Sequence, residues 1–528
     1  MFTSAIRHAS LALACALLGL LQACGGGGGY GGGTTTTSAP PPAPVISSIN
    51  GSAVASGSPG TGFIVYGNHF GALSGSGMTA GYSVDFRDAA SNAIVASASY
   101  AGSGWTNTYI KAVVPGSGLT VGTTYKVTVT TPNGTSNAVE FTVTAAVAFS
   151  PSTIAWGSTS ALPAAIQGFP SVVAPIRVTA GGVTTITNYV YTFGGNTAAS
   201  STPGGRSANV ASVYSNVVND GSAGGDAGAL VNAAWTTESN ALPAALGFAA
   251  GAAANGFNSG VTGHGVVYVL GGLDDAGAAT STVYYAALGS NGSVGAWATT
   301  TPLPAARYTF GAAIFRGRLY VAGGYDAADT ATATVHSAPI NSDGTLGAWS
   351  PLPALPAPVA YHALVTTGGT LYVLGGTLSA AIDPVSTTQS IGTVDAVDYN
   401  SIEPDGTLAG AGWTANPNSL IKAVEKHTVV AIGSYVLASG GLYAGANTGS
   451  TEQTYAVQST VDASLEAFQG ATGSQTIINS PGGYNFYNHS AALYVDPSGN
   501  PHVLILGGQT VGDLVVPPAV QSGVWYMK

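Results

Sequence analysis

Short apolar runs of Val, Leu, Ile and Tyr recur along most of the chain, and each ends at glycine or at a polar turn. Two copies of one unit stand in tandem between Leu303 and Gly376. The second copy repeats Leu319, Tyr320, Gly323 and Gly324 fifty-two residues later as Leu371, Tyr372, Gly375 and Gly376. Such runs predict strands, and a fixed period of this size predicts a propeller or a solenoid.

A double glycine ends one apolar run in every unit. The six pairs begin at Gly194, Gly271, Gly323, Gly375, Gly440 and Gly507. Glycine suits a strand end where the chain turns tightly or meets a neighbouring backbone. A second pair of runs is joined by Asn-Gly or Asp-Gly, the preferred pair of a type I′ hairpin. We therefore expect six all-β units.

A bulky aromatic follows each of these hairpins, except in one unit. These aromatic residues are Trp235, Trp297, Trp349, Trp413 and Phe468, five for six units. The missing member stands at the front of the array, where Trp156 precedes Leu162 and Pro163 as Trp297 precedes Leu303 and Pro304. The strand around Trp156 is therefore predicted to be the outer strand of the last unit, beside Tyr526.

With these repeats, residues 154–528 resemble a kelch-repeat β-propeller of the kind found in bacterial surface proteins. The resemblance implies six blades of four strands. It does not imply one activity, because kelch propellers include binding scaffolds, a copper oxidase and a sugar epimerase. The extra residues of the longer units, 196–210, 377–394, 441–452 and 509–521, would join second to third strands and share one face. Long loops on one face of a rigid scaffold favour binding.

Residues 1–24 resemble a bacterial lipoprotein signal peptide. Arg7 and His8 precede an apolar core from Ala9 to Leu21, and LQAC would make Cys24 the lipidated residue. An ordinary signal peptide stays open as an alternative, whereas the apolar run is shorter than the ~20 residues of a membrane-spanning helix. Residues 25–44, rich in Gly, Thr and Pro, are expected to form a disordered tether. The absence of aspartate at Gly25 implies an outer-membrane address, and we expect the folded part to be exposed at the cell surface.

Residues 45–143 show alternating strands separated by glycine and Asn-Gly turns, which predicts an immunoglobulin-like β-sandwich. The signals around Gly67–Gly71, Val114-Pro115 and Asn133-Gly134 resemble an IPT/TIG domain. His69 is expected to be a turn residue and not a ligand. Residues 144–153 form a linker. The predicted fold is therefore all-β, a six-bladed kelch-type propeller preceded by an immunoglobulin-like sandwich.

The amino-acid composition restricts the kinds of partner and cofactor that this protein can bind. Only 6% of residues are charged and the formal net charge is −10, so nucleic acid is an improbable partner. Both cysteines, Cys15 and Cys24, lie in the signal region, which leaves no disulfide and no thiolate metal site in the folded part. The copper radical chemistry of the oxidase branch needs a cysteine crosslinked to tyrosine and is therefore excluded. We expect no cofactor, and a membrane contact through the Cys24 lipid only.

Alignment of the units on their double glycines brings three histidines to one position. The aligned residues are Phe169, Phe248, Phe310, His362, His427 and His489. Imidazoles converging on a channel mouth could bind a metal or a polar ligand. The alternative, which we favour because other units have phenylalanine there, is packing with a hydrogen bond to a neighbouring backbone.

The candidate ligand-binding residues are those in and beside this alignment, on the face with the long loops. They are Arg307, Tyr308, Tyr361, His362, Glu425, Lys426, His427, Phe486, Tyr487, Asn488 and His489, near Tyr484. Aromatic side chains with a few polar groups suit carbohydrate or peptide. Solvated loop tips are the alternative.

Three functions follow from these residues. The leading hypothesis is a surface-displayed, lipid-anchored binding protein without enzymatic activity, whose ligand is a glycan, a peptide or an envelope protein. The second is a sugar-processing enzyme resembling kelch-type sialic acid epimerases, in which Glu425, Arg307 and a histidine act as acid and base. The third is a structural adhesin or spacer.

Overall fold

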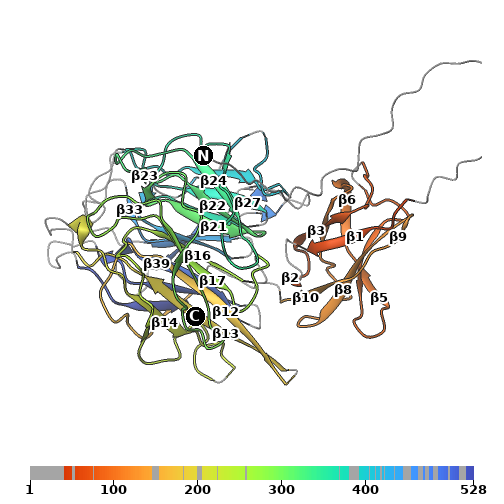
Figure 1. The fold of residues 1–528 in the computed structure, drawn as a ribbon, viewed down its shortest axis with the longest axis horizontal. Helices are drawn as coiled ribbons and strands as arrows, with labels where there is room; N and C mark the ends of the chain where they lie inside the picture. Colours follow the sequence, from red (N-terminus) through yellow and green to blue (C-terminus); the bar gives the residue numbers. More distant parts are fainter. Residues whose placement is uncertain are drawn as a thin grey trace, which may run out of the picture. The chain divides into compact units, whose positions relative to one another are not determined.

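The computed structural model is all-β. It describes residues 41–527 except 50–53, 75–76, 146–153, 182, 199–204, 223, 256–258, 368, 380–391, 404, 411, 417–418, 421–422, 433–434, 444–452, 459, 462–467, 470–474, 480–485, 497–499 and 511–518. The predicted signal peptide with Cys24 and most of the predicted tether thus lie outside the described residues. Apart from the short 3-10 helix η2 (Gly205–Ser207), the elements in these ranges are strands (Figure 1). No helix among them has the length and hydropathy to cross a bilayer.

Ten strands between Val45 and Val143 form two sheets around one core. The first sheet has the order β1 (Val45–Ile49), β3 (Gly62–Asn68), β7 (Tyr109–Val113), β6 (Ser99–Trp105). The second has the order β2 (Val54–Gly57), β10 (Val139–Val143), β8 (Thr124–Thr131), β4 (Ser83–Arg87), β5 (Ile94–Ser97), with β9 (Gly134–Thr135) on β8. The strands pair antiparallel except β2 with β10.

Side chains alternate between the two faces of these strands, as the pleat of a strand requires. Phe63, Phe86 and Phe141 meet in the core with ring centroids 5.3 to 5.7 Å apart. The indole nitrogen of Trp105 donates to the carbonyl of Phe70 over 2.9 Å. His69, directly before Phe70, lies in an exposed loop and has a φ of 64°, which is consistent with a turn residue.

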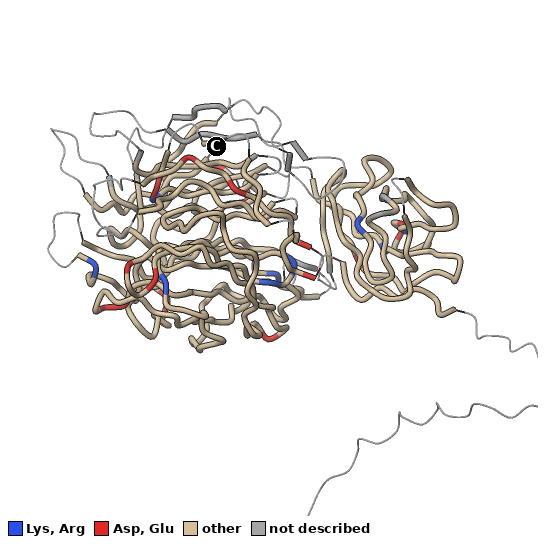
Figure 2. Tube along the Cα trace, turned by 90° about the horizontal axis from the view of Figure 1, so that it is seen from above, with Lys and Arg blue, Asp and Glu red and all other residues tan. Residues whose placement is uncertain are grey.

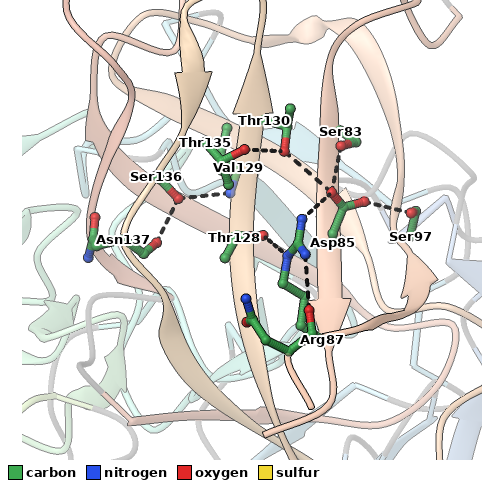
Figure 3. A network of polar contacts seen from close by, with 11 residues as sticks. Ser83, Asp85, Arg87, Ser97, Thr128, Val129, Thr130, Thr135, Ser136 and Asn137 are labelled. Atoms are coloured by element: carbon green, nitrogen blue, oxygen red, sulfur yellow. Dashed lines mark hydrogen bonds and ion pairs between the residues drawn. The ribbon is translucent and has the colours of Figure 1, made fainter. Parts of the chain in front are cut away.

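The outer face of β4 and β8 carries a polar network (Figure 3). Asp85, 2% exposed, accepts hydrogen bonds from the hydroxyls of Ser83 and Ser97, both 2.7 Å. Arg87 lies 3.9 Å from the same carboxylate and donates to Thr128 over 2.9 Å. Because its partners satisfy the buried carboxylate, this network serves the sheet and leaves no ligand position.

Between Trp156 and Met527 the described residues form six four-stranded antiparallel sheets. The first three are β12 (Ser171–Ala180), β13 (Val183–Phe193), β14 (Val213–Val217), β15 (Thr236–Thr237); β16 (Ala250–Ala254), β17 (Val266–Leu270), β18 (Val283–Ala287), β19 (Ala298–Thr299); and β21 (Gly311–Phe315), β22 (Arg318–Ala322), β24 (Val335–Pro339), β25 (Ser350–Leu352). The others are β26 (Ala363–Thr367), β27 (Thr370–Leu374), β28 (Val397–Ser401), β29 (Thr414–Ala415); β31 (Thr428–Ile432), β32 (Tyr435–Ser439), β34 (Gln453–Gln458), β37 (Gln475–Asn479); and β39 (Ser490–Val495), β40 (Pro501–Leu506), β42 (Val524–Met527), β11 (Trp156–Ser158). The strands β35 (Thr460–Val461) and β36 (Phe468–Gln469) form a separate pair.

The first strands of the six sheets are neighbours in a closed order. β12 lies beside β16, β16 beside β21, β21 beside β26, β26 beside β31, β31 beside β39, and β39 again beside β12. The apolar cores lie between successive sheets, as where Leu270 of one and Leu319 of the next share a core.

The last sheet combines both ends of this array. β11 pairs antiparallel with β42, with Gly157 opposite Tyr526 and Trp156 opposite Met527. The predicted pairing of the Trp156 strand with the Tyr526 strand is confirmed. The deficit of one hairpin aromatic in the sequence is the local signal that made it predictable.

The tryptophans tie neighbouring sheets together. The indole nitrogens of Trp235, Trp297 and Trp413 donate to the carbonyls of Ser160, Asn240 and Pro353 over 2.9 to 3.0 Å, each acceptor following the outer strand of the preceding sheet. The turn at Asp343 and Gly344 is a hairpin as expected, but it is not type I′. Only Gly344 has a positive φ (85°), and its amide donates to Asn341. A type I turn closed by a left-handed glycine has this geometry.

Candidate functional site

A short antiparallel pair extends each of the six sheets beyond the double glycine. Three are two-stranded sheets: β20 (Arg307–Tyr308) with β23 (Tyr325–Asp326), β30 (Val424–Glu425) with β33 (Leu442–Tyr443), and β38 (Phe486–Tyr487) with β41 (Gln509–Thr510). The other three are the single bridges Gln167–Asn196, Gly247–Leu273 and Ala360–Thr377. These pairs place the candidate residues on the side of the sheets from which the long loops leave.

One residue after each of these pairs has a left-handed backbone. The six are Gly168, Phe248, Thr309, Tyr361, Lys426 and Asn488, with φ of 52° to 59°. A left-handed backbone costs a non-glycine residue roughly 1 to 2 kcal/mol. Five such residues in equivalent places need a common cause.

That cause is a closed ring of backbone hydrogen bonds. The amide of each residue donates to the carbonyl of its equivalent in the neighbouring sheet: Gly168 to Asn488 (2.7 Å), Asn488 to Lys426 (3.0 Å), Lys426 to Tyr361 (3.1 Å), Tyr361 to Thr309 (3.1 Å), Thr309 to Phe248 (3.0 Å) and Phe248 to Gly168 (2.5 Å). We call these six residues the backbone ring. It brings one residue from each sheet into a single ring, and all of them except Gly168 carry a side chain there.

The double glycines define the position next to the ring. A Cβ atom on the second glycine of each pair would lie 2.5 to 3.0 Å from the Cβ of one residue in the same sheet. These residues are Phe169, Ala249, Phe310, His362, His427 and His489. Phe248, expected at or near this position, lies one residue before it, because Phe248 belongs to the backbone ring and Ala249 takes the equivalent place.

The three histidines are packed as apolar rings between sheets. They are 4% to 7% exposed, and His362 and His427 abut Gly323 and Gly375 of the preceding sheet. Burial lowers the pKa of His362 to about 4, partly offset by the backbone of Ala322, and lowers the pKa of His427 to about 3.

His489 has the same environment. Burial lowers its pKa to about 3, and its Nε2 lies 2.9 Å from the hydroxyl of Thr428. Nowhere in the described ranges do three or more His, Cys, Asp or Glu side chains gather as metal ligands would. Burial between the sheets therefore favours packing over ligand binding for the aligned histidines. The hydrogen bond to a neighbouring backbone that this interpretation included is not found for His362 and His427, whose ring nitrogens have no hydrogen-bond partner among the described residues.

Arg307 is not on a solvated loop. It is 2% exposed, and its terminal nitrogens donate to the carbonyl of Gly323 over 3.1 Å and to the hydroxyl of Thr334 over 3.0 Å. Burial lowers the pKa of Arg307. Its guanidinium fastens the start of β20 to its own sheet, which is a structural role and not the exposed one that the sequence suggested.

Four tyrosines and one lysine meet beside the backbone ring. Tyr308, Tyr325, Tyr361 and Tyr487 are at most 5% exposed, and the Tyr325 ring centroid lies 5.4 Å from that of Tyr308 and 5.5 Å from that of Tyr361. The Nζ of Lys426 lies 5.0 Å from the Tyr361 centroid and 5.7 Å from the Tyr487 centroid. We call these five residues the tyrosine–lysine cluster. Two aromatic faces around one ammonium form a cation–π arrangement.

Charged groups of both signs flank the cluster. Arg206, from the long loop between β13 and β14, forms a two-pronged ion pair with Asp329 at 2.7 and 2.8 Å. The Tyr308 hydroxyl donates to the same carboxylate over 2.7 Å. Glu425, fully buried, adds to the effect of burial in raising the pKa of Tyr325 and of Tyr361.

Several buried polar atoms here have no hydrogen-bond partner among the described residues. They are the hydroxyls of Tyr361, Tyr487 and Thr309 and both amide atoms of Gln509. Gln509 stands opposite Tyr487 in the β38–β41 pair, so the two side chains share one face. An unpartnered buried polar group costs roughly 1 to 3 kcal/mol. Such groups in one place are typical of a site that a ligand completes.

The structure thus brings together Tyr308, Tyr361, Glu425, Lys426 and Tyr487 and separates Arg307 and the histidines from them as packing residues. Asn488 belongs to the backbone ring and donates through its side chain to Gln167 over 2.9 Å. The side chain of Phe486, the whole of Tyr484 and Cys24 lie outside the described residues. Sequence reasoning missed Arg206, Tyr325, Asp329 and Gln509. Tyr325 and Gln509 directly follow a double glycine, but other units have Asn196, Leu273, Thr377 and Leu442 there, and Arg206 and Asp329 lie in loops that share no spacing.

No protein-family model matches this chain, and no curated protein matches it significantly.

Proposed function

We propose that this protein is a lipid-anchored binding protein of the bacterial envelope, and that the tyrosine–lysine cluster with its neighbours is its ligand site. The observation that carries the proposal is the set of buried, unpartnered hydroxyl and amide groups at Tyr361, Tyr487 and Gln509. A packed core seldom keeps several such groups together, whereas a binding site uses them to orient a ligand.

The proposed scaffold is a six-bladed kelch-type β-propeller, preceded by an IPT/TIG-like immunoglobulin sandwich. Support for the propeller comes from the closed order of first strands and from the backbone ring. Support for the sandwich comes from the two sheets that enclose the core of Phe63, Phe86 and Phe141. On such a scaffold a site at the propeller centre lies where one residue from every blade is available.

The proposed ligand is a glycan or a peptide, because aromatic faces combined with few polar groups suit both. The left-handed backbones of Tyr361 and Lys426, like that of Phe248, are imposed by the backbone ring and do not bear on the choice of ligand.

The test is an array of glycans and peptides probed with the full-length protein in detergent. We expect one chemical class to bind, and we expect Lys426→Met to abolish that signal while circular dichroism stays that of a folded β protein. Equal binding by the variant would place recognition elsewhere. An empty array would favour the spacer hypothesis.

A further inference from the structure

The charged groups around the tyrosine–lysine cluster balance. Arg206 and Asp329 neutralise each other in a two-pronged pair. Lys426 and Glu425 are neighbours in the chain, 4% and 0% exposed, and contribute one charge of each sign. His362, His427 and His489 add no charge at neutral pH, because burial holds each pKa at about 4 or below. These groups therefore offer no net charge for an ionic ligand to neutralise, and the buried guanidinium of Arg307, next to Tyr308 in the chain, already donates to Gly323 and Thr334.

The unpartnered groups can both donate and accept. Tyr361, Tyr487 and Thr309 each present a hydroxyl, and Gln509 presents a carbonyl and an amino group. A carboxylate or phosphate can only accept hydrogen bonds, so it would leave part of this set unused. Sugar hydroxyls donate and accept, as these side chains do.

The tyrosine rings supply the apolar part of the site. The rings of Tyr361 and Tyr487 both lie near the Lys426 ammonium, 5.0 and 5.7 Å from centroid to Nζ, and Tyr325 packs edge-on to Tyr361 at an interplanar angle of 77°. The C–H face of a pyranose matches such rings, because it is apolar while the rim of the sugar is polar.

We infer that the ligand group taken by this cluster is an uncharged, hydroxyl-rich saccharide unit, and that its carboxylated counterpart is rejected. The inference rests on the proposed function and narrows it. A carboxylate entering the buried site would bring a negative charge without a free positive partner, and a buried uncompensated charge is costly.

The experiment is titration calorimetry of the full-length protein in detergent with matched sugar pairs: glucose against glucuronic acid, and galactose against galacturonic acid. We expect a neutral sugar of one pair to bind at least roughly tenfold more tightly than its acid. Equal or tighter binding of the acid overturns the inference, as does the absence of binding by every neutral sugar. If the array described above detects binding of a peptide or an acidic glycan, the proposed binding function is supported and only the inference of a neutral saccharide is contradicted.

Two tyrosine-to-phenylalanine substitutions distinguish a hydroxyl that binds the ligand from one that stabilises the fold. Tyr487→Phe removes an unpartnered hydroxyl, so we expect weaker sugar binding by roughly tenfold with an unchanged or higher Tm. The matched control is Tyr191→Phe, whose equally buried hydroxyl donates to the carbonyl of Gly292 over 2.6 Å. It should lower the Tm and leave the affinity unchanged. A Tyr487→Phe variant that loses stability and keeps its affinity would show that the hydroxyl is structural and would overturn the inference.

Discussion

His362, His427 and His489 occupy the position that holds Phe169 and Phe310 in two other sheets. In all five places a planar ring is buried between neighbouring sheets, and at Phe169, Phe310, His362 and His427 a glycine of the adjacent sheet leaves room for the ring. Imidazole fits this space only in its neutral form, because the site offers little to solvate a charge. Histidine thus serves here as a planar ring of suitable shape. Because the folded protein disfavours protonation of that ring, the fold should be less stable in acid.

The free energy of unfolding should therefore fall as the pH is lowered. The folded protein keeps His362 neutral down to about pH 4, whereas the unfolded chain takes up the proton near pH 6.5. Between these values the unfolded state binds more protons, so stability decreases by about 2 kcal/mol for this residue at about pH 5. We expect His362→Phe to reduce the drop in Tm between about pH 7 and pH 5, measured by differential scanning calorimetry. His69→Gln, in an exposed loop, is the control, and an unchanged pH slope in His362→Phe would refute this account.

Arg307→Ala should lower stability, because the guanidinium is buried and makes two hydrogen bonds to Gly323 and Thr334. We expect a loss of roughly 2 kcal/mol or more, measured by urea denaturation. Arg177→Ala, at an exposed position of β12, should change stability by no more than about 0.5 kcal/mol. A similar, small effect of both substitutions would mean that Arg307 contributes nothing to the fold.

At the scale of the elements, the short strand β11 closes the last sheet of the array. Its three residues complete the sheet of β39, β40 and β42 and cover the outer edge of β42. An uncovered edge presents unpaired amides and carbonyls to other chains.

Deletion of residues 154–158 should expose this edge. We expect the variant to form oligomers or aggregates that size-exclusion chromatography with light scattering detects, since an unpaired edge recruits other strands. Replacement of the same residues by a strand of unrelated Thr and Val should restore the monomer. A deletion variant that stays monomeric with an unchanged Tm would show that the pairing is dispensable.

The elements also show how far the sequence was informative. The six sheets were predictable because each carries its own signals within a few residues: an apolar run, a double glycine and a hairpin glycine such as Gly344. The backbone ring was not, because nothing in the type of Thr309 or Tyr361 indicates a left-handed backbone; the bonds to neighbouring sheets impose it. For the same reason the pair of Arg206 with Asp329, 123 residues apart, left no local trace.

Across the whole molecule, charge is sparse. Figure 2 shows the few Lys, Arg, Asp and Glu residues of the described chain, and the formal net charge is −10. A basic patch that could hold an anionic membrane surface is not evident in the sequence, so the proposed attachment depends on the lipid at Cys24.

Cys24→Ser should therefore release the protein from membranes. We expect the variant in the soluble fraction after cell lysis and the parent protein in the detergent phase, with immunoblotting of both fractions as the measurement. The tether of about 20 residues, which would span roughly 25 Å as a flexible coil, should keep the Tm of the folded part the same in both. Unchanged partitioning of the variant would contradict lipidation.

The pairing of β11 with β42 also determines when the last sheet can form during synthesis of the chain. β11 is synthesised before the other strands of the six-sheet array, and its partner β42 follows them. Until then one sheet lacks two of its four strands, and long-range pairings of this kind form slowly. A nonsense mutation that removes β42 would thus leave β11 without a partner, and the truncated product would be a substrate for proteases and chaperones.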